Sequence, residues 1–322
     1  TIQWSTDGDG TFDDPNAESP NYYLGLSDIW DGDVELCISI EAAGECQFNV
    51  TQCITVYVPQ QLIYFHKNGW WGISSYLDTD LPSVPEVMDP LVLVPGSQHL
   101  INMVDKQGNY FWPEPIPPQS TLEDWMPVGY KLKVKNTPAC LPIYGDSLID
   151  QTFDVTGSFT YLPTLTNVPV EVESLFEGHV NDILLIFHWA TNELWTPVAS
   201  DFDSIYPGYA YLMVNRIGAD DYTIEYPDFV PDAPHLYPVQ VPVKDSWVNN
   251  SPWADVENTA RPHIFLFGEN ALARLQPGDI LGAFSADGAC HGMAEYGDKD
   301  AIYKLVAMGM DNFAKDSRGF SA

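Results

Sequence analysis

Residues 34–58 read VELCISIEAAGECQFNVTQCITVYV, which is two runs of alternating apolar and polar residues separated by a segment containing Gly44. Alternation of this length predicts β-strands with one apolar face, and the glycine predicts a turn between them. The stretch therefore predicts a β-hairpin. One set of apolar side chains from each run is expected to face inward: Leu36, Ile38 and Ile40 from the first, Val50, Ile54 and Val56 from the second.

The same alternation places two cysteines on the outer face of the hairpin. Cys37 and Cys53 lie opposite each other if the strands pair around Gly44, so a cross-strand disulfide is expected. There are two alternatives to this disulfide: either cysteine pairs with Cys46, or all three thiols are unpaired. The chain has no Cys-x-x-Cys pair that would indicate zinc or redox chemistry.

The composition describes a folded and strongly acidic chain. Its 322 residues are 45% hydrophobic, enough for roughly two to four small domains. The 45 Asp and Glu against 13 Lys and Arg give a formal charge of −32, which repels phosphate backbones and excludes nucleic-acid binding. No segment has the roughly 20 apolar residues of a membrane helix, so membrane insertion is not expected. The 26 prolines and 13% aromatic residues, with short apolar runs between turn residues, favour a mainly β fold.

An internal duplication is predicted in the middle of the chain. SSYLDTDLPSVPEVMDPL parallels FTYLPTLTNVPVEVESLF, NMVDKQGNYFWPEP parallels LLIFHWATNELWTPV, and VGYKLKVKN parallels PGYAYLMVN. These parallels align Trp112 with Trp195 and Tyr130 with Tyr209. Each copy is small for an independent core, so the two are expected to pack as one pseudo-symmetric β-rich body with short helices. We therefore expect β-sandwich-like modules in series along the chain. They are a partial sandwich over 1–59, repeat copies over 60–150 and 151–230, and a C-terminal β module over 231–322.

The first module resembles a known repeat family. WSTDGDGTFDDPNAESPNYYLGLSDIWDGDVELCISI, continued by CQFNVTQCITVYV, is similar to the PKD-like or immunoglobulin-like repeats that occur in tandem in very large secreted proteins of Bacteroidota. Members of that family usually have an additional N-terminal strand or two. The resemblance therefore implies a sheet that needs strands from upstream or from another chain.

Later parts of the chain resemble β-rich modules of the same group of surface proteins. The set GWWGISSYL, GNYFWP, LEDW and GYKLKV is similar to a module near the ends of such proteins, and residues 278–320 resemble one that normally continues with further strands. The resemblance implies a truncated C-terminal module, type IX secretion, a location on the bacterial cell surface and no catalytic residues. It also implies O-glycans at Ser147 and Ser204, which lie in Asp-Ser-aliphatic tripeptides.

The acidic stretch DGDGTFDDPNAE, residues 7–18, has the spacing of a calcium loop. An EF-hand is not expected, because Phe12 stands where the sharp turn requires Gly and the flanks are typical of strands. Two interpretations stay open. One is a solvated acidic turn in which Phe12 plugs the core; the other is a weak calcium site formed by Asp7, Asp9, Asp13 and Asp14.

The sequence contains no pattern of a known catalytic site. It has no HExxH, GxSxG, Walker or GxGxxG motif. Cys290 and His291 are adjacent, but neighbours on a strand point to opposite faces and cannot share a proton. His188, within an apolar run, is expected to be packed and not to bind a metal.

Exposed aromatic side chains could stack on sugars, although a core role is favoured because Trp112 and Trp195 occupy equivalent positions. The candidates for stacking are Trp70, Trp71, Trp112, Trp125 and Trp195.

These patterns predict a non-catalytic secreted surface protein that acts as an adhesin, a spacer or a fibre component. Its expected partners are neighbouring modules, like subunits or surface glycans, and no cofactor is expected besides calcium. Self-assembly is a variant of this function, because an incomplete sandwich offers an open strand edge. A carbohydrate-binding accessory region of a larger polysaccharide-degrading enzyme is the alternative.

Overall fold

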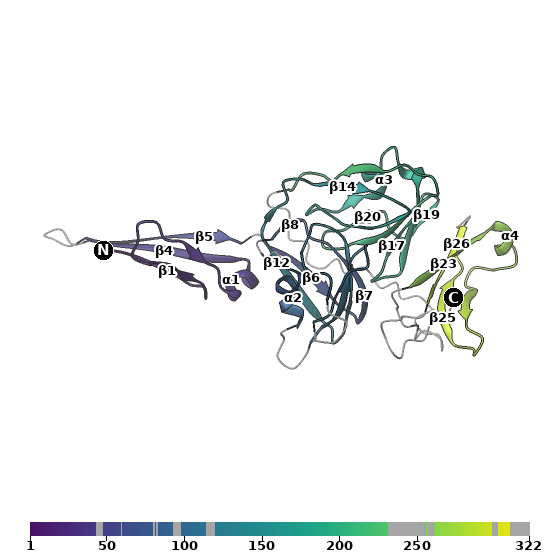
Figure 1. Cartoon of the computed structure of the whole chain (residues 1–322), viewed down its shortest axis with the longest axis horizontal. Helices are drawn as coiled ribbons and strands as arrows, with labels where there is room; N and C mark the ends of the chain where they lie inside the picture. The colour runs from purple at the N-terminus through teal and green to yellow at the C-terminus, as the bar shows by residue number, and fades with distance from the viewer. Residues whose placement is uncertain are drawn as a thin grey trace.

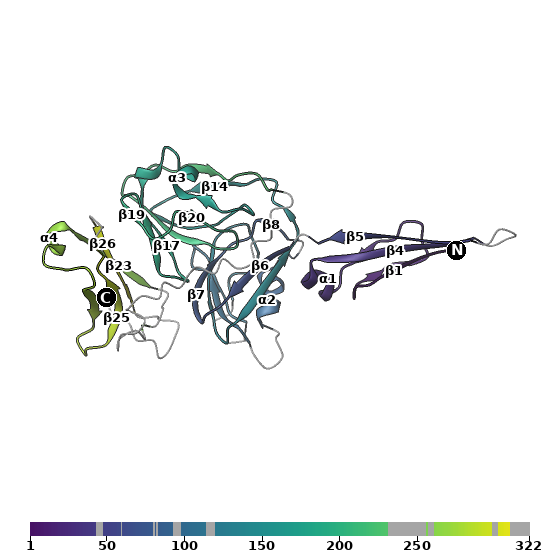
Figure 2. The same cartoon turned by 180° about the vertical axis from the view of Figure 1, so that it is seen from behind.

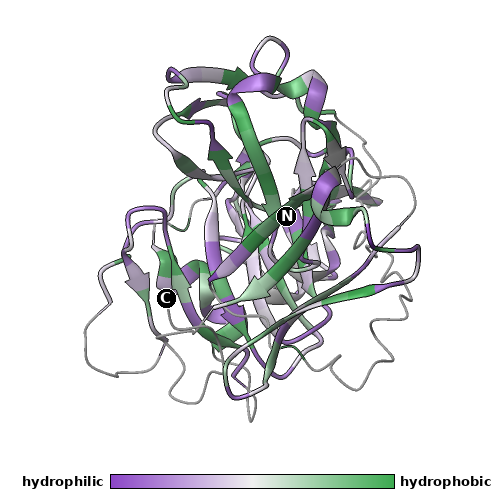
Figure 3. Cartoon of the chain, turned by 90° about the vertical axis from the view of Figure 1, so that its right-hand side faces the viewer, coloured by the Kyte–Doolittle hydropathy of each residue, from purple (hydrophilic) through white to green (hydrophobic). Residues whose placement is uncertain are grey.

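The computed structural model describes residues 1–42, 48–58, 60–79, 81, 83–92, 98–113, 120–230, 256, 261–297 and 302–309. These residues form a mainly β protein with short helices. An N-terminal sheet projects from a larger central body, and a C-terminal sheet lies against the opposite side of that body (Figures 1 and 2). Hydrophobic and hydrophilic residues are interleaved along the strands (Figure 3).

The N-terminal sheet has the strand order β1-β4-β5. It consists of β1 (Ile2–Thr6), β4 (Asp33–Ala42) and β5 (Phe48–Tyr57). Both pairings are antiparallel, with Cys37 opposite Cys53 and Leu36 opposite Ile54. This is the register that the alternation predicts. The turn at Gly44 and the alternative disulfide partner Cys46 lie outside the described residues.

A second layer covers one half of this sheet. It contains β2 (Thr11–Phe12), β3 (Tyr22–Tyr23) and α1 (Leu26–Asp31). The ring centroid of Phe12 lies 6.0 Å from that of Trp4 and 4.8 Å from that of Tyr22. Phe12 therefore packs between the sheet and the second layer. Val34 on β4 is buried, whereas Ile54 on β5 is exposed, so the sandwich is closed over β1 and open over β5.

The central body contains two sets of strands with the same pairing. The first repeat has β6 (Gln60–Phe65), β7 (Gly69–Ile73), β8 (Leu77–Asp78), α2 (Val84–Val92), β9 (Leu100–Val104), β10 (Tyr110–Phe111), β11 (Tyr130–Val134), β12 (Ala139–Tyr144) and β13 (Asp146–Ser147). The second has β14 (Thr152–Val155), β15 (Phe159–Leu162), β16 (Val170–Glu171), α3 (Val172–Leu175), the 3-10 helix η1 (Val180–Asp182), β17 (Ile183–His188), β18 (Glu193–Thr196), β19 (Ala199–Ser200), β20 (Ser204–Ile205), β21 (Tyr211–Asn215) and β22 (Tyr222–Glu225).

The strand order β10-β9-β11-β7 of the first repeat recurs as β18-β17-β21-β15 in the second, where β19 adds an edge strand. In the same way, the pair β6–β12 of the first repeat corresponds to β14–β22 of the second. The two repeats therefore share the topology of these sheets. Their short pairs β8–β13 and β16–β20 differ, because β13 follows β12 whereas β20 precedes β21.

The strand registers correct the predicted alignment of the repeats. The strands β11 and β21 have the same length and the same alternation of burial, which makes their central residues, Leu132 and Met213, equivalent. Leu132 lies opposite Met103, which lies opposite Phe111. In the second repeat, Met213 lies opposite Ile186, which lies opposite Trp195. Phe111, and not Trp112, is therefore the equivalent of Trp195.

The tyrosine alignment shifts as well. Because Leu132 corresponds to Met213, Tyr130 corresponds to Tyr211 and not to Tyr209. The hydrogen bonds agree with this assignment. The hydroxyl of Tyr130 accepts from the Met126 N–H at 2.8 Å, and that of Tyr211 accepts from the Tyr206 N–H at 3.1 Å.

The two repeats meet around a local pseudo-two-fold axis. Gly72 packs closely on the backbone of Ala210, and Gly129 packs closely on that of Tyr161. By the registers above, Gly72 corresponds to Tyr161 and Gly129 to Ala210. The two contacts are therefore the same contact repeated with the roles exchanged, which is the property of an isologous interface.

One hydrophobic core runs through both repeats. Trp71 and Leu132 of the first belong to the same buried cluster as Leu162 and Met213 of the second. Neither repeat encloses this core alone.

The C-terminal sheets pair β23 (Pro262–Gly268) with β26 (Ile302–Met308) and β24 (Ile280–Phe284) with β25 (Cys290–Glu295), with α4 (Glu269–Leu272) after β23. Ile264 and Val306 pack against a second buried cluster on the central body. The Lys304 ammonium donates to the Leu194 carbonyl at 3.2 Å and pairs with the Asp201 carboxylate. The second cluster consists of Trp70, Leu185, Phe187, Trp189 and Leu194.

Candidate interaction surface

The apolar face of β5 is exposed. Ile54 exposes 62% of its surface, Val50 50% and Val56 38%. Their alternation places them on the predicted side of the sheet, but the prediction that they face inward into a core is wrong, because the second layer stops short of β5. We call the edge of β5, together with Val50, Ile54 and Val56, the β5 surface.

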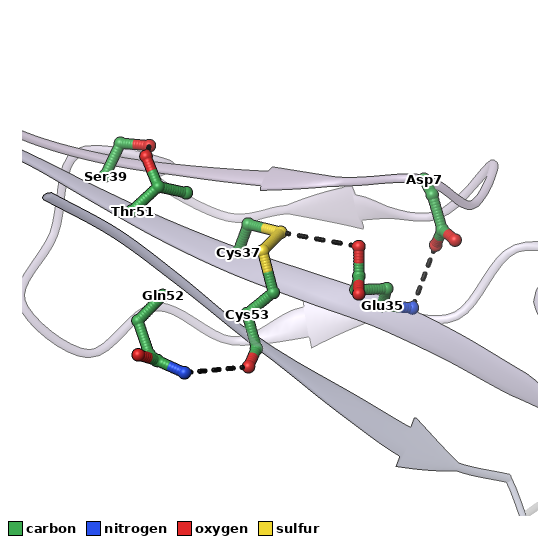
Figure 4. Close-up of a disulfide and its surroundings, with 7 residues drawn as sticks. All are labelled: Asp7, Glu35, Cys37, Ser39, Thr51, Gln52 and Cys53. Atoms are coloured by element: carbon green, nitrogen blue, oxygen red, sulfur yellow. Dashed lines mark hydrogen bonds between the residues drawn. A yellow bond between two sulfur atoms is a disulfide. The ribbon is translucent and has the colours of Figure 1, made fainter.

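The free edge of β5 presents backbone hydrogen-bonding groups. Within the described residues β5 pairs only with β4. The Cα atoms of Cys37 and Cys53 are 4.0 Å apart, which identifies a non-hydrogen-bonded pair of the antiparallel ladder. In such a pair the N–H and C=O groups point away from the partner strand, so those of Thr51, Cys53 and Thr55 point to the open edge. The Gln52 side-chain amide donates to the Cys53 carbonyl at 3.3 Å (Figure 4).

The sequence of β5 lacks the features that usually protect an edge strand. FNVTQCITVY, residues 48–57, contains no charged residue, no proline and no glycine. Natural edge strands are commonly blunted by lysine, proline or bulges, because an unprotected edge pairs with other chains. A ten-residue strand spans about 33 Å. The β5 surface is therefore long enough to bind a full strand from a partner.

The disulfide stiffens this surface from the opposite face. Cys37 and Cys53 are bonded, and two residues away the Ser39 and Thr51 hydroxyls lie 2.9 Å apart across the same two strands (Figure 4). These cross-links tie β5 to β4. They leave its outer edge available.

The disulfide also excludes a metal site at the same place. Glu35, Cys37 and Cys53 bring ligand atoms within 4.8 Å of one another, the one such group among the residues that the structure describes. Both sulfurs are used in the disulfide, so neither is the thiolate that metals require. The group is a structural cross-link.

Two of the predicted calcium ligands bind the backbone instead. Asp7 Oδ1 accepts from the Glu35 N–H at 2.8 Å, and Asp9 Oδ1 accepts from the Ser27 N–H at 2.9 Å. Asp7 thereby attaches the loop to β4. Asp9 binds the first turn of α1.

The other two predicted ligands organise the turn itself. Asp13 accepts from the backbone and side-chain amides of Asn21 at 2.9 and 2.8 Å, and Asp14 accepts from the Asn16 N–H at 3.0 Å. The hydrogen bond from the Asn21 side chain lowers the pKa of Asp13. Within the described loop, no three of the four predicted carboxylates bring their oxygens within 4.8 Å of one another. Calcium binding stays a prediction, and it would require the loop to rearrange.

Asp28, which is not among the predicted calcium ligands, is the acidic residue that organises this module. Its carboxylate is buried and accepts from the Tyr22 hydroxyl at 2.8 Å, the Gly25 N–H at 2.8 Å and the Asp9 N–H at 3.2 Å. A buried carboxylate is stable only when it is hydrogen-bonded in this way. Its position as the third residue of α1 was the available signal, since a carboxylate there can accept from the N–H of the N-cap residue, here Gly25.

The structure does not support the sugar-stacking role of the tryptophans. Four of them are buried, and the Lys131 ammonium lies 5.0 Å above the ring of one, Trp70. A ring enclosed on both faces cannot receive a sugar. Trp112 alone is partly exposed, with its ring 6.5 Å from that of Tyr110. The buried four are Trp70, Trp71, Trp125 and Trp195.

The predicted glycosylation residues lie on short surface strands. Ser147 of β13 pairs with Leu77, and Ser204 of β20 pairs with Glu171. Both are half-buried. Their modification stays a prediction.

The adjacent Cys290 and His291 do not interact with each other. The Cys290 thiol donates to the Gly292 carbonyl at 3.5 Å, and His291 Nε2 lies 2.8 Å from Ser285 Oγ. Ser285 donates its hydroxyl proton to Asp287. The serine hydroxyl therefore donates to a carboxylate and not to the imidazole. This hydrogen bonding is typical of a turn, whereas a serine nucleophile would donate to its histidine base.

The described part of the chain has no helix long and apolar enough to cross a membrane. No family model matches the chain, and no curated protein and no solved structure matches it significantly.

Proposed function

We propose that this chain belongs to a non-catalytic, secreted surface protein that works as an adhesin, a spacer or a fibre component by docking other β elements on the β5 surface. The observation that carries the proposal is the open half of the N-terminal sheet. An uncharged edge strand beside exposed Val50, Ile54 and Val56 is suited to β-strand addition, in which main-chain hydrogen bonds give affinity and side-chain contacts give specificity.

Two further features support an extracellular role. The Cys37–Cys53 disulfide is typical of oxidising compartments. A formal charge of −32 keeps such a surface protein soluble and repels nucleic acids. The resemblance to tandem repeats of Bacteroidota adds type IX secretion and the bacterial cell surface to the proposal.

The location can be tested on cells that produce the protein naturally. Protease treatment of intact cells should remove it, and peptides mapped without reduction should contain the Cys37–Cys53 link. Recovery of the protein from the interior of protease-treated cells, with both thiols reduced, would refute an extracellular role.

A further inference from the structure

We propose that the β5 surface binds the β5 surface of a second copy of this chain, as an antiparallel pair with a two-fold axis at Cys53. The inference rests on the proposed function, because it names the occupant of the docking surface.

The sequence of β5 is nearly palindromic about Cys53. Residues 50–56 read V-T-Q-C-I-T-V. In an isologous interface every contact occurs twice with the roles exchanged, so a strand that pairs with itself must place compatible residues at equal distances on the two sides of its centre. Pairing about Cys53 places Val50 opposite Val56, Thr51 opposite Thr55 and Gln52 opposite Ile54. Apolar and Thr–Thr cross-strand pairs stabilise antiparallel sheets.

The backbone of β5 fits this register. The outward N–H and C=O groups belong to Thr51, Cys53 and Thr55, as the short Cα distance at the disulfide requires. Pairing about Cys53 brings Thr51 to Thr55 of the second copy and Cys53 to its own equivalent. Every outward donor therefore meets an outward acceptor, and the six strands of two N-terminal sheets become one continuous sheet.

The same register joins the two exposed apolar faces. Val50, Ile54 and Val56 lie on one side of β5, and the two-fold axis at Cys53 keeps them on the same side of the combined sheet. The exposed side chains of each copy then lie beside those of the other. Lateral contact between Val50 of one copy and Val56 of the other removes part of this apolar surface from water, which stabilises the pair.

The shape of the chain leaves room for the second copy. The N-terminal sheet extends away from the central body in both views (Figures 1 and 2). In an antiparallel pair the second central body lies beyond the far end of the hairpin. The two bodies are therefore separated by about the length of the strands.

The charge predicts how the pair responds to salt. Two chains of formal charge −32 repel each other at long range, but β5 itself has no charged residue, so the contact adds no like-charge pair. Added salt screens the repulsion and should strengthen the pair. A basic partner would respond in the opposite direction.

Sedimentation velocity on the whole chain tests the inference, from micromolar to millimolar protein at low and high sodium chloride. The wild type should form dimers that salt strengthens. The variant Gln52→Lys/Ile54→Lys sets lysine opposite lysine twice in the proposed register. Its matched control, Gln52→Glu/Ile54→Lys, sets glutamate opposite lysine twice. The all-lysine variant should dimerise at least about tenfold more weakly than the control.

Both variants change exposed side chains, so both should fold with the disulfide intact. A wild type that stays monomeric at millimolar concentration, dimers that salt weakens, or equal affinities of the two variants would each overturn the inference. If the chain stays monomeric while the outward amides of β5 exchange rapidly, the proposed self-pairing is wrong but the β5 surface can still bind another partner. If those amides are already protected in the monomer, the docking function fails as well.

Discussion

The N-terminal sheet and the central body are built from strands with similar alternation, yet they bury their apolar faces very differently. In the central body Trp71 and Leu132 are fully buried, because a second repeat packs on the first. In the N-terminal sheet Ile54 is 62% exposed, because the covering layer reaches only β1 and part of β4. Alternation therefore determines the side to which a residue points. Burial depends on whether another layer is present.

The largest contrast should appear on shortening one side chain in each region. Leu132→Ala should lower the free energy of unfolding of the central body by about 2–5 kcal/mol, because it leaves a cavity in a fully buried position. Ile54→Ala should cost no more than about 0.5 kcal/mol, because the side chain is mostly exposed. Urea unfolding of both variants in dilute protein measures this. Similar losses would mean that Ile54 is covered.

The disulfide should matter only to the N-terminal sheet. Replacing both cysteines in Cys37→Ser/Cys53→Ser should destabilise that sheet by about 3 kcal/mol, since the bond closes a loop of 16 residues. Hydrogen exchange should accelerate in β4 and β5 and stay unchanged in β11. Faster exchange in β11 would show that the two regions unfold together.

The pseudo-two-fold contacts of the central body should respond equally to matched substitutions. Gly72→Ala would drive a methyl group into the Ala210 carbonyl, and Gly129→Ala would drive one into that of Tyr161. Each should cost roughly 1–3 kcal/mol in thermal or urea unfolding.

Gly268→Ala is the control for this pair, because its added methyl meets no atom within 4 Å. It should change stability by less than about 0.5 kcal/mol. A large loss at one of the two central glycines and none at the other would contradict the two-fold arrangement.

The smallest predicted effect near neutral pH is a pH dependence that arises in the central body. Burial, with smaller contributions from Lys67 and His66, lowers the pKa of His188 from 6.5 to about 3. The folded chain keeps this ring neutral, whereas the unfolded chain binds a proton below pH 6.5. The stability from His188 is therefore complete above that pH and is lost toward pH 3, by about 1.4 kcal/mol per pH unit.

Comparison of the wild type with His188→Phe isolates this contribution, because the carboxylates titrate alike in both. The difference in unfolding free energy should shift against the wild type between about pH 7.5 and about pH 5.5. A difference independent of pH would mean that His188 has the same pKa in the folded and the unfolded chain.

The sequence predicted the mainly β fold and the hairpin register, because both depend on local alternation. It also placed Cys37 opposite Cys53, and one of the two interpretations of residues 7–18 had Phe12 packed inward, as its ring contacts with Trp4 and Tyr22 show. It could not predict the exposure of Val50, because the second layer formed by the described residues does not extend over β5. The spacing of the carboxylates in residues 7–18 left an acidic turn and a calcium site open, because it could not show that Asp7 and Asp9 accept hydrogen bonds from backbone amides.

The sequence predicted the duplication, but the predicted alignment of the two repeats was wrong. The predicted alignment matched the aromatic residues Trp112 and Trp195, whereas the strand registers make Phe111 equivalent to Trp195. Phe111 and Trp195 are both buried and Trp112 is only partly so. The inward-facing position is what the two repeats share, and residue type alone did not reveal it.

The most direct test of the account is residue-by-residue amide exchange along β5, measured by NMR in dilute protein. The account predicts slow exchange at Gln52, Ile54 and Val56, which bond to β4, and fast exchange at the outward amides of Thr51, Cys53 and Thr55. The outward amides should become protected as the protein is concentrated. Equal protection of all six amides in dilute protein would contradict the account, because the edge of β5 would then be covered within a single chain.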